Sequence, residues 1–197
     1  MDNDRTRIPI RRLPVRGERP ALPETNPAST AHAAATDKLA RSFGREPELI
    51  LACLETEEPD SPRLPLVLAA AEQAIAACPN YADLRYAAAQ VAVRLGRHAE
   101  ARSWLDGALE LNPGYRDALI LAARVAMAEN RPDEALPVLQ RALAHGADYA
   151  DVHVMLGEVW KKLDDVAQAA QAYRRALEIN GDLASAQRGL ATCVHPE

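Results

Sequence analysis

Cysteine and histidine are the chain's first candidates for chemistry, since a thiolate beside an imidazole can act as an activated nucleophile. Cys193 and His195 lie two residues apart, which is the closest such pairing in the sequence. The pair falls in a predicted terminal capping segment, beside the chain end. We therefore predict no catalytic role for it.

Three of the other histidines fit packing better than catalysis. His98 falls in a predicted turn, His145 at the end of a predicted helix, and His153 where a half-buried packing residue is expected. The chain contains no HExxH, no GxSxG, no phosphate loop and no Cys/His set with metal-ligand spacing. The acidic run LETEEPD is typical of a solvated turn. The sequence thus predicts no enzyme, no metal site and no cofactor.

Composition favours closely packed helices. Hydrophobic residues make up 48% of the 197 residues but aromatic residues only 4%, and alanine supplies much of the apolar content. The three cysteines are odd in number and far apart, which favours a reducing compartment. No apolar run approaches the ~20 residues that span a bilayer, and the first residues lack a secretory signal. We expect an all-α protein in the cytoplasm, and its Arg- and Ala-rich usage favours a bacterial source.

Charge is distributed unevenly along the chain. Residues 1–30 hold six arginines and four acidic residues, whereas the remainder holds 17 basic and 24 acidic residues. An acidic body argues against nucleic acid as a partner, because binding to phosphates begins with a basic face. It favours basic protein segments instead.

A period of 34 residues organises the chain. The phrases YADLRY, YRDALI and YADVHV begin at Tyr81, Tyr115 and Tyr149. Alanines recur at the same spacing, as do residues suited to turns; these sets are Ala101, Ala135 and Ala169, then Ala108, Ala142 and Ala176, and then Gly96, Asn130 and Asp164. Three complete copies follow without insertion, at 82–115, 116–149 and 150–183.

This register resembles the tetratricopeptide repeat (TPR), a helix–turn–helix unit of 34 residues. The third copy matches best, with Leu156, Gly157, Trp160, Ala169, Tyr173 and Ala176 at the positions that the family prefers. The first copy departs at Arg85, which stands at a position for a large apolar residue, and Gly181 stands where proline is expected. The resemblance implies a right-handed α-solenoid with a concave groove lined by the first helix of each unit. Its small residues let paired helices approach closely, and an aspartate near the start of each first helix is expected to cap it.

Weaker segments flank the three copies. Residues 48–81 form a degenerate copy, preceded by a capping helix at 29–47 that Ser29 or Thr30 would cap. Its apolar face is expected to carry Ala35, Leu39 and Phe43. Residues 184–197 form a terminal capping helix and tail, and residues 1–28 a basic, proline-rich arm.

The resemblance also implies which residues line the groove. In TPR proteins these are chiefly positions 2, 5, 9 and 12 of each unit. They correspond to Asp83, Tyr86, Gln90, Val93, Asp117, Ile120, Arg124, Met127, Asp151, Val154, Glu158 and Lys161. Helix capping alone would explain the aspartates, and local packing would explain Ile120 and Met127. The variety that grips chaperone carboxylate tails is not expected, because three aspartates and Tyr86 stand where that variety has basic and amide residues.

The arm carries one phrase twice, RIPIR followed by RLPVR. Proline restrains itself and the preceding residue to extended backbone, so apolar and basic side chains should alternate. We predict a docking element formed by Arg7, Ile8, Ile10, Arg11, Arg12, Leu13, Val15 and Arg16. A solvated tail whose arginines prevent aggregation is the alternative.

These features predict a non-enzymatic adaptor. Its groove would hold a peptide segment of a partner protein, and its arm would dock on a second surface or on another copy of the chain. Two alternatives remain open: a secretion-type chaperone that holds export substrates, and an assembly or regulatory subunit of a larger enzyme.

Overall fold

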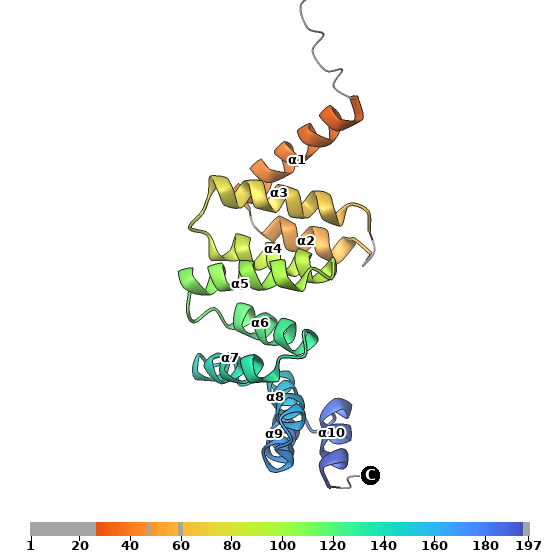
Figure 1. Ribbon diagram of the computed structural model, residues 1–197, viewed down its shortest axis with the longest axis vertical. Coiled ribbons are helices and arrows are strands. Elements are labelled where there is room, and N and C mark those ends of the chain that lie inside the picture. The colour runs from red at the N-terminus through yellow and green to blue at the C-terminus, as the bar shows by residue number, and fades with distance from the viewer. Residues whose placement is uncertain (1–26, 47, 59–60, 195–197) are drawn as a thin grey trace, which may run out of the picture.

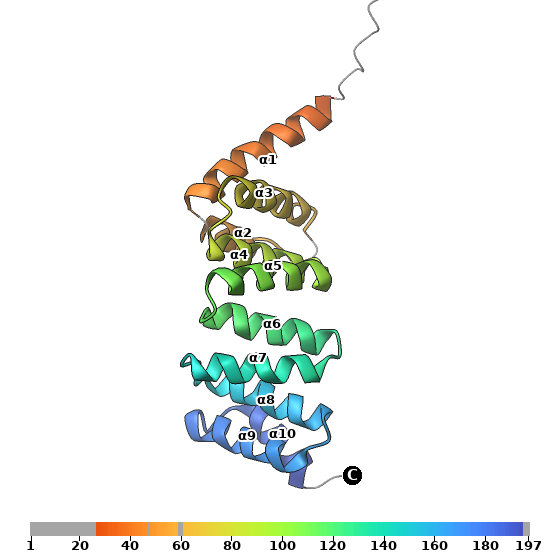
Figure 2. The same ribbon diagram turned by 60° about the vertical axis from the view of Figure 1, so that its left-hand side comes forward.

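A computed structural model describes residues 27–46, 48–58 and 61–194. The predicted docking arm lies outside this part, as does His195. Within the described residues ten helices stack into an elongated array (Figures 1 and 2). They are α1 (Pro27–Arg45), α2 (Glu48–Thr56), α3 (Leu64–Ala77), α4 (Ala82–Arg94), α5 (His98–Leu111), α6 (Arg116–Ala128), α7 (Pro132–Ala144), α8 (Ala150–Lys162), α9 (Val166–Ile179) and α10 (Ala184–Val194). In this array α3 lies between α1 and α2, and the helices from α4 to α9 follow chain order. The all-helical fold is as predicted.

Three helical hairpins form the regular part of the array: α4 with α5, α6 with α7, and α8 with α9. Small residues make the close approach of each pair possible. Ala101, Ala135 and Ala169 are completely buried, and so are Ala108, Ala142 and Ala176. A larger side chain at these positions would overpack the hairpin, at a cost of about 1–3 kcal/mol.

The turns inside the hairpins use left-handed backbone. Gly96, Asn130 and Asp164 have φ values of 70°, 58° and 60°. Each ends its helix with a pair of backbone hydrogen bonds; in the first turn the Arg97 amide donates to the Ala92 carbonyl at 2.8 Å and the Gly96 amide to Val93 at 3.0 Å. This is the Schellman arrangement, which satisfies the free carbonyls of a helix end. The prediction that these residues form the turns is confirmed.

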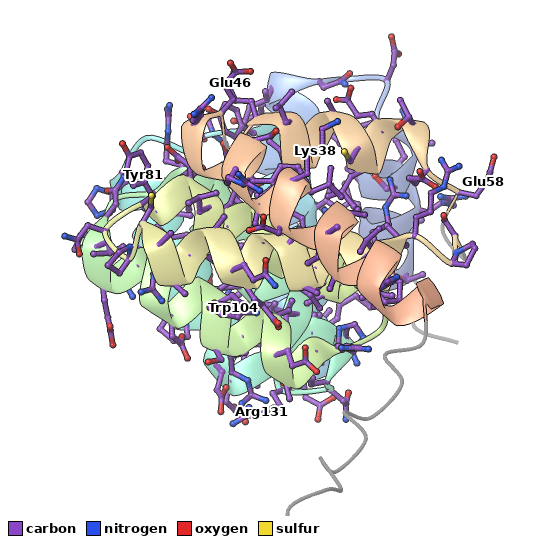
Figure 3. All side chains as sticks on the ribbon, turned by 90° about the horizontal axis from the view of Figure 1, so that it is seen from above. Lys38, Glu46, Glu58, Tyr81, Trp104 and Arg131 are labelled. Atoms are coloured by element: carbon purple, nitrogen blue, oxygen red, sulfur yellow. The ribbon has the colours of Figure 1, made fainter. Side chains whose placement is uncertain are left out.

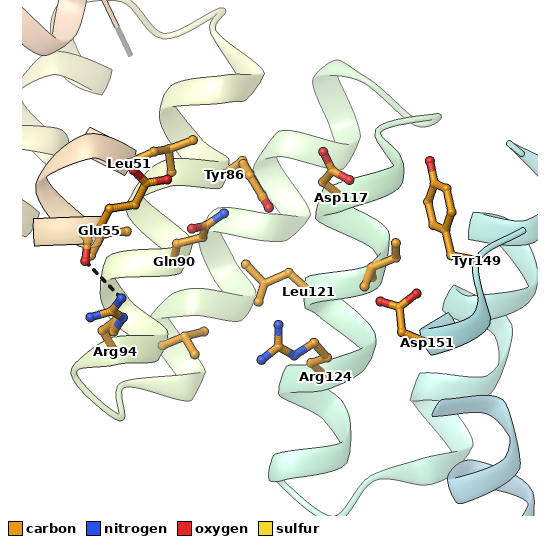
Figure 4. Close-up of a pocket in the computed structure, with 13 residues that line it drawn as sticks. Leu51, Glu55, Tyr86, Gln90, Arg94, Asp117, Leu121, Arg124, Tyr149 and Asp151 are labelled. Carbon is orange, nitrogen blue, oxygen red and sulfur yellow. Dashed lines mark hydrogen bonds between the residues drawn. The ribbon is translucent and has the colours of Figure 1, made fainter. Parts of the chain in front are cut away.

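The prediction that an aspartate caps the first helix of each repeat is wrong. The residues that cap α4, α6 and α8 are Tyr81, Tyr115 and Tyr149, and their side chains make no capping hydrogen bond. Each aspartate follows in the first helical turn, where the helix dipole still favours a negative charge. Their carboxylates are exposed and face the concave side (Figure 4) or its edge.

The unusual Arg85 is accommodated by a glycine on the paired helix. Its guanidinium donates to the Pro79 carbonyl at 3.1 Å. A Cβ atom at Gly107 would lie only 2.7 Å from Arg85 Nη1. The small residue therefore makes room for the long side chain that replaces an apolar one in this repeat.

The N-terminal end of the array is less regular. Helix α3 packs more extensively on α1 than on α2, which is only nine residues long. Figure 3 shows α1 lying over this end of the array. Helix α1 begins at Pro27, before the expected cap, and so takes in two residues assigned to the arm. Its buried face is formed by Thr36, Ala40 and Phe43, whereas Ala35 is exposed and does not belong to it.

Helix α10 closes the other end by packing on α9 and α8. It covers Tyr173, which lies between Gly157 and Gly189, and it helps bury Val154. None of the described helices is long and apolar enough to cross a membrane.

Candidate peptide-binding groove

The first helices of successive units line a hollow on the concave face. Helices α2, α4, α6 and α8 contact one another in that order and leave a groove of about 900 Å³. Figure 4 shows Gln90, Leu121 and Arg124 facing this space, with Tyr149 and Asp151 at the start of α8. The residues that line it are Leu51, Leu54, Glu55, Tyr86, Gln90, Val93, Arg94, Asp117, Ile120, Leu121, Arg124, Tyr149 and Asp151.

Seven of the twelve predicted groove residues lie together in this hollow: Tyr86, Gln90, Val93, Asp117, Ile120, Arg124 and Asp151. Asp83 lines a smaller adjoining pocket. Met127, Glu158 and Lys161 lie apart, in a depression against α10. Val154 is only 7% exposed and packs with Tyr173 and Ala186, so its prediction as a groove residue is wrong. The terminal helix covers this part of the last repeat.

The floor of the groove is apolar, and three carboxylates and two arginines line the groove around it. Val93 and Ile120 are half-buried, leaving part of each side chain accessible. The carboxylates of Glu55, Asp117 and Asp151 surround this floor. An extended segment laid across it would therefore meet apolar contacts flanked by acceptors for N–H groups.

Of the two arginines that line the groove, Arg94 is already engaged. Its guanidinium donates to the carbonyl oxygens of Leu54 and Glu57, at 3.0 and 3.1 Å, and one of these bonds is drawn in Figure 4. These carbonyls lie at the end of α2, where a positive charge also complements the helix dipole. Arg94 thus fixes α2 against α4, and Arg124 is exposed to the groove.

The adjoining pocket, which we call the tyrosine pocket, has a volume of about 370 Å³. It is lined by Glu48, Leu51, Tyr81, Asp83, Tyr86, Ala87 and Tyr115. The rings of Tyr86 and Tyr115 are tilted by 48° with centroids 5.1 Å apart. The pocket and the groove share Leu51 and Tyr86, so they lie side by side.

The two phenols that form this pair are held in their neutral form. Burial raises the pKa of Tyr115, and the neighbouring Asp83 carboxylate raises it further. Burial also raises the pKa of Tyr86, with the Asp117 charge acting in the same direction. Both rings therefore present an uncharged aromatic face.

Sequence reasoning missed Arg94 and Leu121, which directly follow the predicted Val93 and Ile120, and two further groups of lining residues. Tyr81, Tyr115 and Tyr149 recur at the 34-residue period just before each first helix, and that spacing was a usable signal. Leu51, Leu54 and Glu55 belong to the degenerate unit, where the family positions do not predict which face of α2 is turned inward.

The histidine at the core position has a structural role. His153 is 8% exposed, and its Nε2 lies 2.7 Å from Asp148 Oδ1. Arg175 of α9 donates to the other oxygen of Asp148 at 2.9 Å. These two hydrogen bonds, with that from His153 the larger, hold the pKa of Asp148 below its ordinary value. The cluster ties the start of α8 to α9, and His153 is more buried than predicted.

Comparisons with known proteins agree with the repeat architecture. Two models described as tetratricopeptide repeat match the chain, one at residues 82–125 and the other at 105–159 and 126–193. Together they cover more than half of it. No curated protein sequence matches.

Solved structures show the same fold. A crystal structure of MamA is 16% identical, covers 83% of this chain and 81% of its own, and has a TM-score of 0.65. MamA from Desulfovibrio magneticus RS-1 is 19% identical, with coverages of 80% and 83% and a TM-score of 0.68. YrrB, described as a TPR protein with an unusual peptide-binding site, is 26% identical, with coverages of 63% and 64% and a TM-score of 0.59. With its repeats, turns and matching models, the chain belongs to the tetratricopeptide-repeat family.

Proposed function

We propose that this protein is a non-enzymatic cytoplasmic adaptor that binds an extended peptide segment of a partner protein in the groove between α2, α4, α6 and α8. The observation that carries the proposal is the groove itself: about 900 Å³ with an apolar floor bordered by carboxylates. YrrB, which is described as having a peptide-binding site, supports it as a relative at 26% identity.

The floor supplies binding energy and the rim supplies orientation. Each apolar anchor fully buried on Val93, Ile120 and Leu121 contributes about 1.5–3 kcal/mol, against an ordering cost of about 1–2 kcal/mol per backbone residue. A segment with apolar side chains at alternating positions therefore offsets much more of this ordering cost than an unpatterned one. Gln90 and the rim carboxylates then select for donors on the peptide.

The charge of the groove selects against acidic tails. The first TPR of Spaghetti (RPAP3) has been solved with the HSP90 peptide SRMEEVD, but at 17% identity it shares the fold alone. Here Glu55, Asp117 and Asp151 would repel such a peptide. We propose neutral or basic segments as ligands, with the N-terminal arm as a second docking element.

The experiment is selection from a random 12-residue peptide library displayed on phage, using the full-length protein. Selected peptides should bind the wild-type chain and lose at least tenfold in affinity for Ile120→Glu, which places a charge on the floor. Ile179→Glu is the matched control, because Ile179 is exposed on α9 outside the groove. Equal binding to both variants would show that the groove is not the site.

A further inference from the structure

The tyrosine pocket has a composition that the proposed function does not by itself explain. Three tyrosines and two carboxylates, Glu48 and Asp83, line it together with apolar residues, and no basic residue does. Tyr81 is 51% exposed and Tyr149, at the far side of the groove, 43%. Aromatic faces beside carboxylates are a chemical environment for a cation, and the engagement of Arg94 elsewhere leaves these carboxylates without it.

A guanidinium suits this environment better than an ammonium. It is planar, stacks on tyrosine rings and donates several N–H groups to a carboxylate in a fixed geometry. The tilted Tyr86–Tyr115 pair supplies ring faces, and the exposed Asp83 lines the same pocket with its carboxylate. An anionic ligand would instead meet Asp83 and Glu48 as like charges.

The position of the pocket beside the groove sets the pattern of the ligand. Because Leu51 and Tyr86 border both spaces, a peptide whose arginine enters the pocket places its next residues over the apolar floor. The pattern required is an arginine followed closely by apolar residues in extended backbone. The phrase RIPIRRLPVR has this pattern twice.

We propose that the tyrosine pocket is a guanidinium-binding subsite, and that its occupant is residues 7–16 of this chain. This inference rests on the proposed function, since it uses the same groove for the apolar residues. Residues 17–26 span at most about 33–36 Å when extended. Helix α1 is about 28 Å long, and its far end leads directly to Glu48 at the pocket. The arm therefore reaches the subsite of its own chain as well as that of a second copy.

The test is a fluorescence-anisotropy titration with a labelled synthetic peptide of residues 5–18. The receptor is the full-length chain with R7S, R11S, R12S and R16S, which removes the competing arm arginines. This receptor should bind the peptide at least fivefold more tightly than the wild-type chain does, because the intact arm competes. Adding Asp83→Asn should weaken binding about tenfold, the loss of one charge-assisted hydrogen bond.

Matched controls separate the subsite from general attraction. Glu158→Gln removes one carboxylate from the depression at the other end and should leave binding unchanged. Tyr81→Ser, at an exposed position, should weaken binding without altering the fold, as checked by circular dichroism. A peptide with lysine at all four arginine positions should bind at least fivefold more weakly.

The outcomes distinguish this inference from the proposed function. Equal binding to the Asp83→Asn receptor, with loss for Ile120→Glu, would overturn the subsite and leave the peptide-binding groove intact. Failure of the peptide of residues 5–18, with binding of library-selected arginine peptides, would overturn the arm as the occupant. If every groove variant bound the peptide as tightly as the unmodified groove does, the proposed function would be overturned as well.

Discussion

The regular hairpins α4–α9 and the N-terminal helices α1–α3 are built from the same kinds of residue but hold together differently. In the hairpins, buried alanines recur every 34 residues and each helix packs on its neighbour in the chain. At the N-terminal end the period is lost in α2, and α3 packs mainly on α1. A repeat array thus needs only local contacts where its small residues are kept, whereas an irregular end needs an additional helix to bury its apolar face.

The groove spans the boundary between these two regions. Helix α2 contributes Leu51, Leu54 and Glu55, while the regular hairpins contribute the remaining lining. Arg94 of α4 joins the two regions through the carbonyls at the end of α2. The binding surface therefore depends on the irregular end as well as on the repeats.

The largest expected effect is destabilisation of the irregular N-terminal end, helices α1–α3. Phe43 is 1% exposed and anchors α1 on the first core cluster, so Phe43→Ala should lower the free energy of unfolding of this end by about 3–5 kcal/mol. Hydrogen exchange should then speed up in α1 and α3 while α8 and α9 stay protected, since stability in an array is transmitted between neighbours. Uniform loss of protection along the chain would contradict a separate N-terminal region.

A second prediction compares one glycine from each region. A Cβ at Gly157 of α8 would lie 2.6 Å from the buried Tyr173 ring, so Gly157→Ala should destabilise by about 1–3 kcal/mol through overpacking. At Gly44 of α1 the nearest atom is Cys78 Sγ at 3.8 Å, so Gly44→Ala should be neutral or stabilise by about 0.5–1 kcal/mol. Urea unfolding of both variants measures this, and a cost as large at Gly44 would refute the difference in packing.

A small gain in stability is expected from a substitution in one of the hairpin turns. Asp164 adopts φ 60°, which is strained for a residue with a side chain, so Asp164→Gly should stabilise by about 0.5–1 kcal/mol. Asn130→Gly should gain less, because Asn130 also accepts a hydrogen bond from Lys162 Nζ at 2.6 Å. Thermal unfolding of the two variants measures this, and a larger gain for Asn130→Gly than for Asp164→Gly would contradict the prediction.

The smallest effect concerns pH. The pKa of Asp148 is lowered in the folded chain, chiefly by the hydrogen bond with His153, so the unfolded chain binds more protons near this pKa. The stabilising contribution of the carboxylate is therefore complete above the ordinary value of 3.8 and is lost as the pH falls through the lower folded value. Stability of the wild-type chain should fall more steeply below pH 3.8 than that of Asp148→Asn. If the urea midpoints of the two chains fell in parallel with pH, Asp148 would not contribute to the α8–α9 contact.

Sequence reasoning reached furthest where the 34-residue period holds. The alanine positions and the turns at Gly96, Asn130 and Asp164 follow from spacing, since small size and left-handed backbone are properties of single residues. Most of the groove follows from the same frame. Val154 does not, because whether it is exposed depends on where α10 packs, and that is a long-range contact.

The same distinction explains the other errors. The aspartates stand two residues too late to cap their helices, a shift that pattern alone does not resolve. The inward face of α2 is set by contacts with α4 and Arg94 rather than by its own degenerate pattern. Helix packing across the array decided what local sequence left open.

The most direct test of a peptide groove across the two regions is an NMR titration of the labelled full-length chain with a library-selected peptide. Our account predicts amide shift changes concentrated on the inner face of α2, α4 and α6, around Leu51, Tyr86 and Ile120. Shift changes confined to α5, α7 and α9, the second helices of the hairpins, would contradict it.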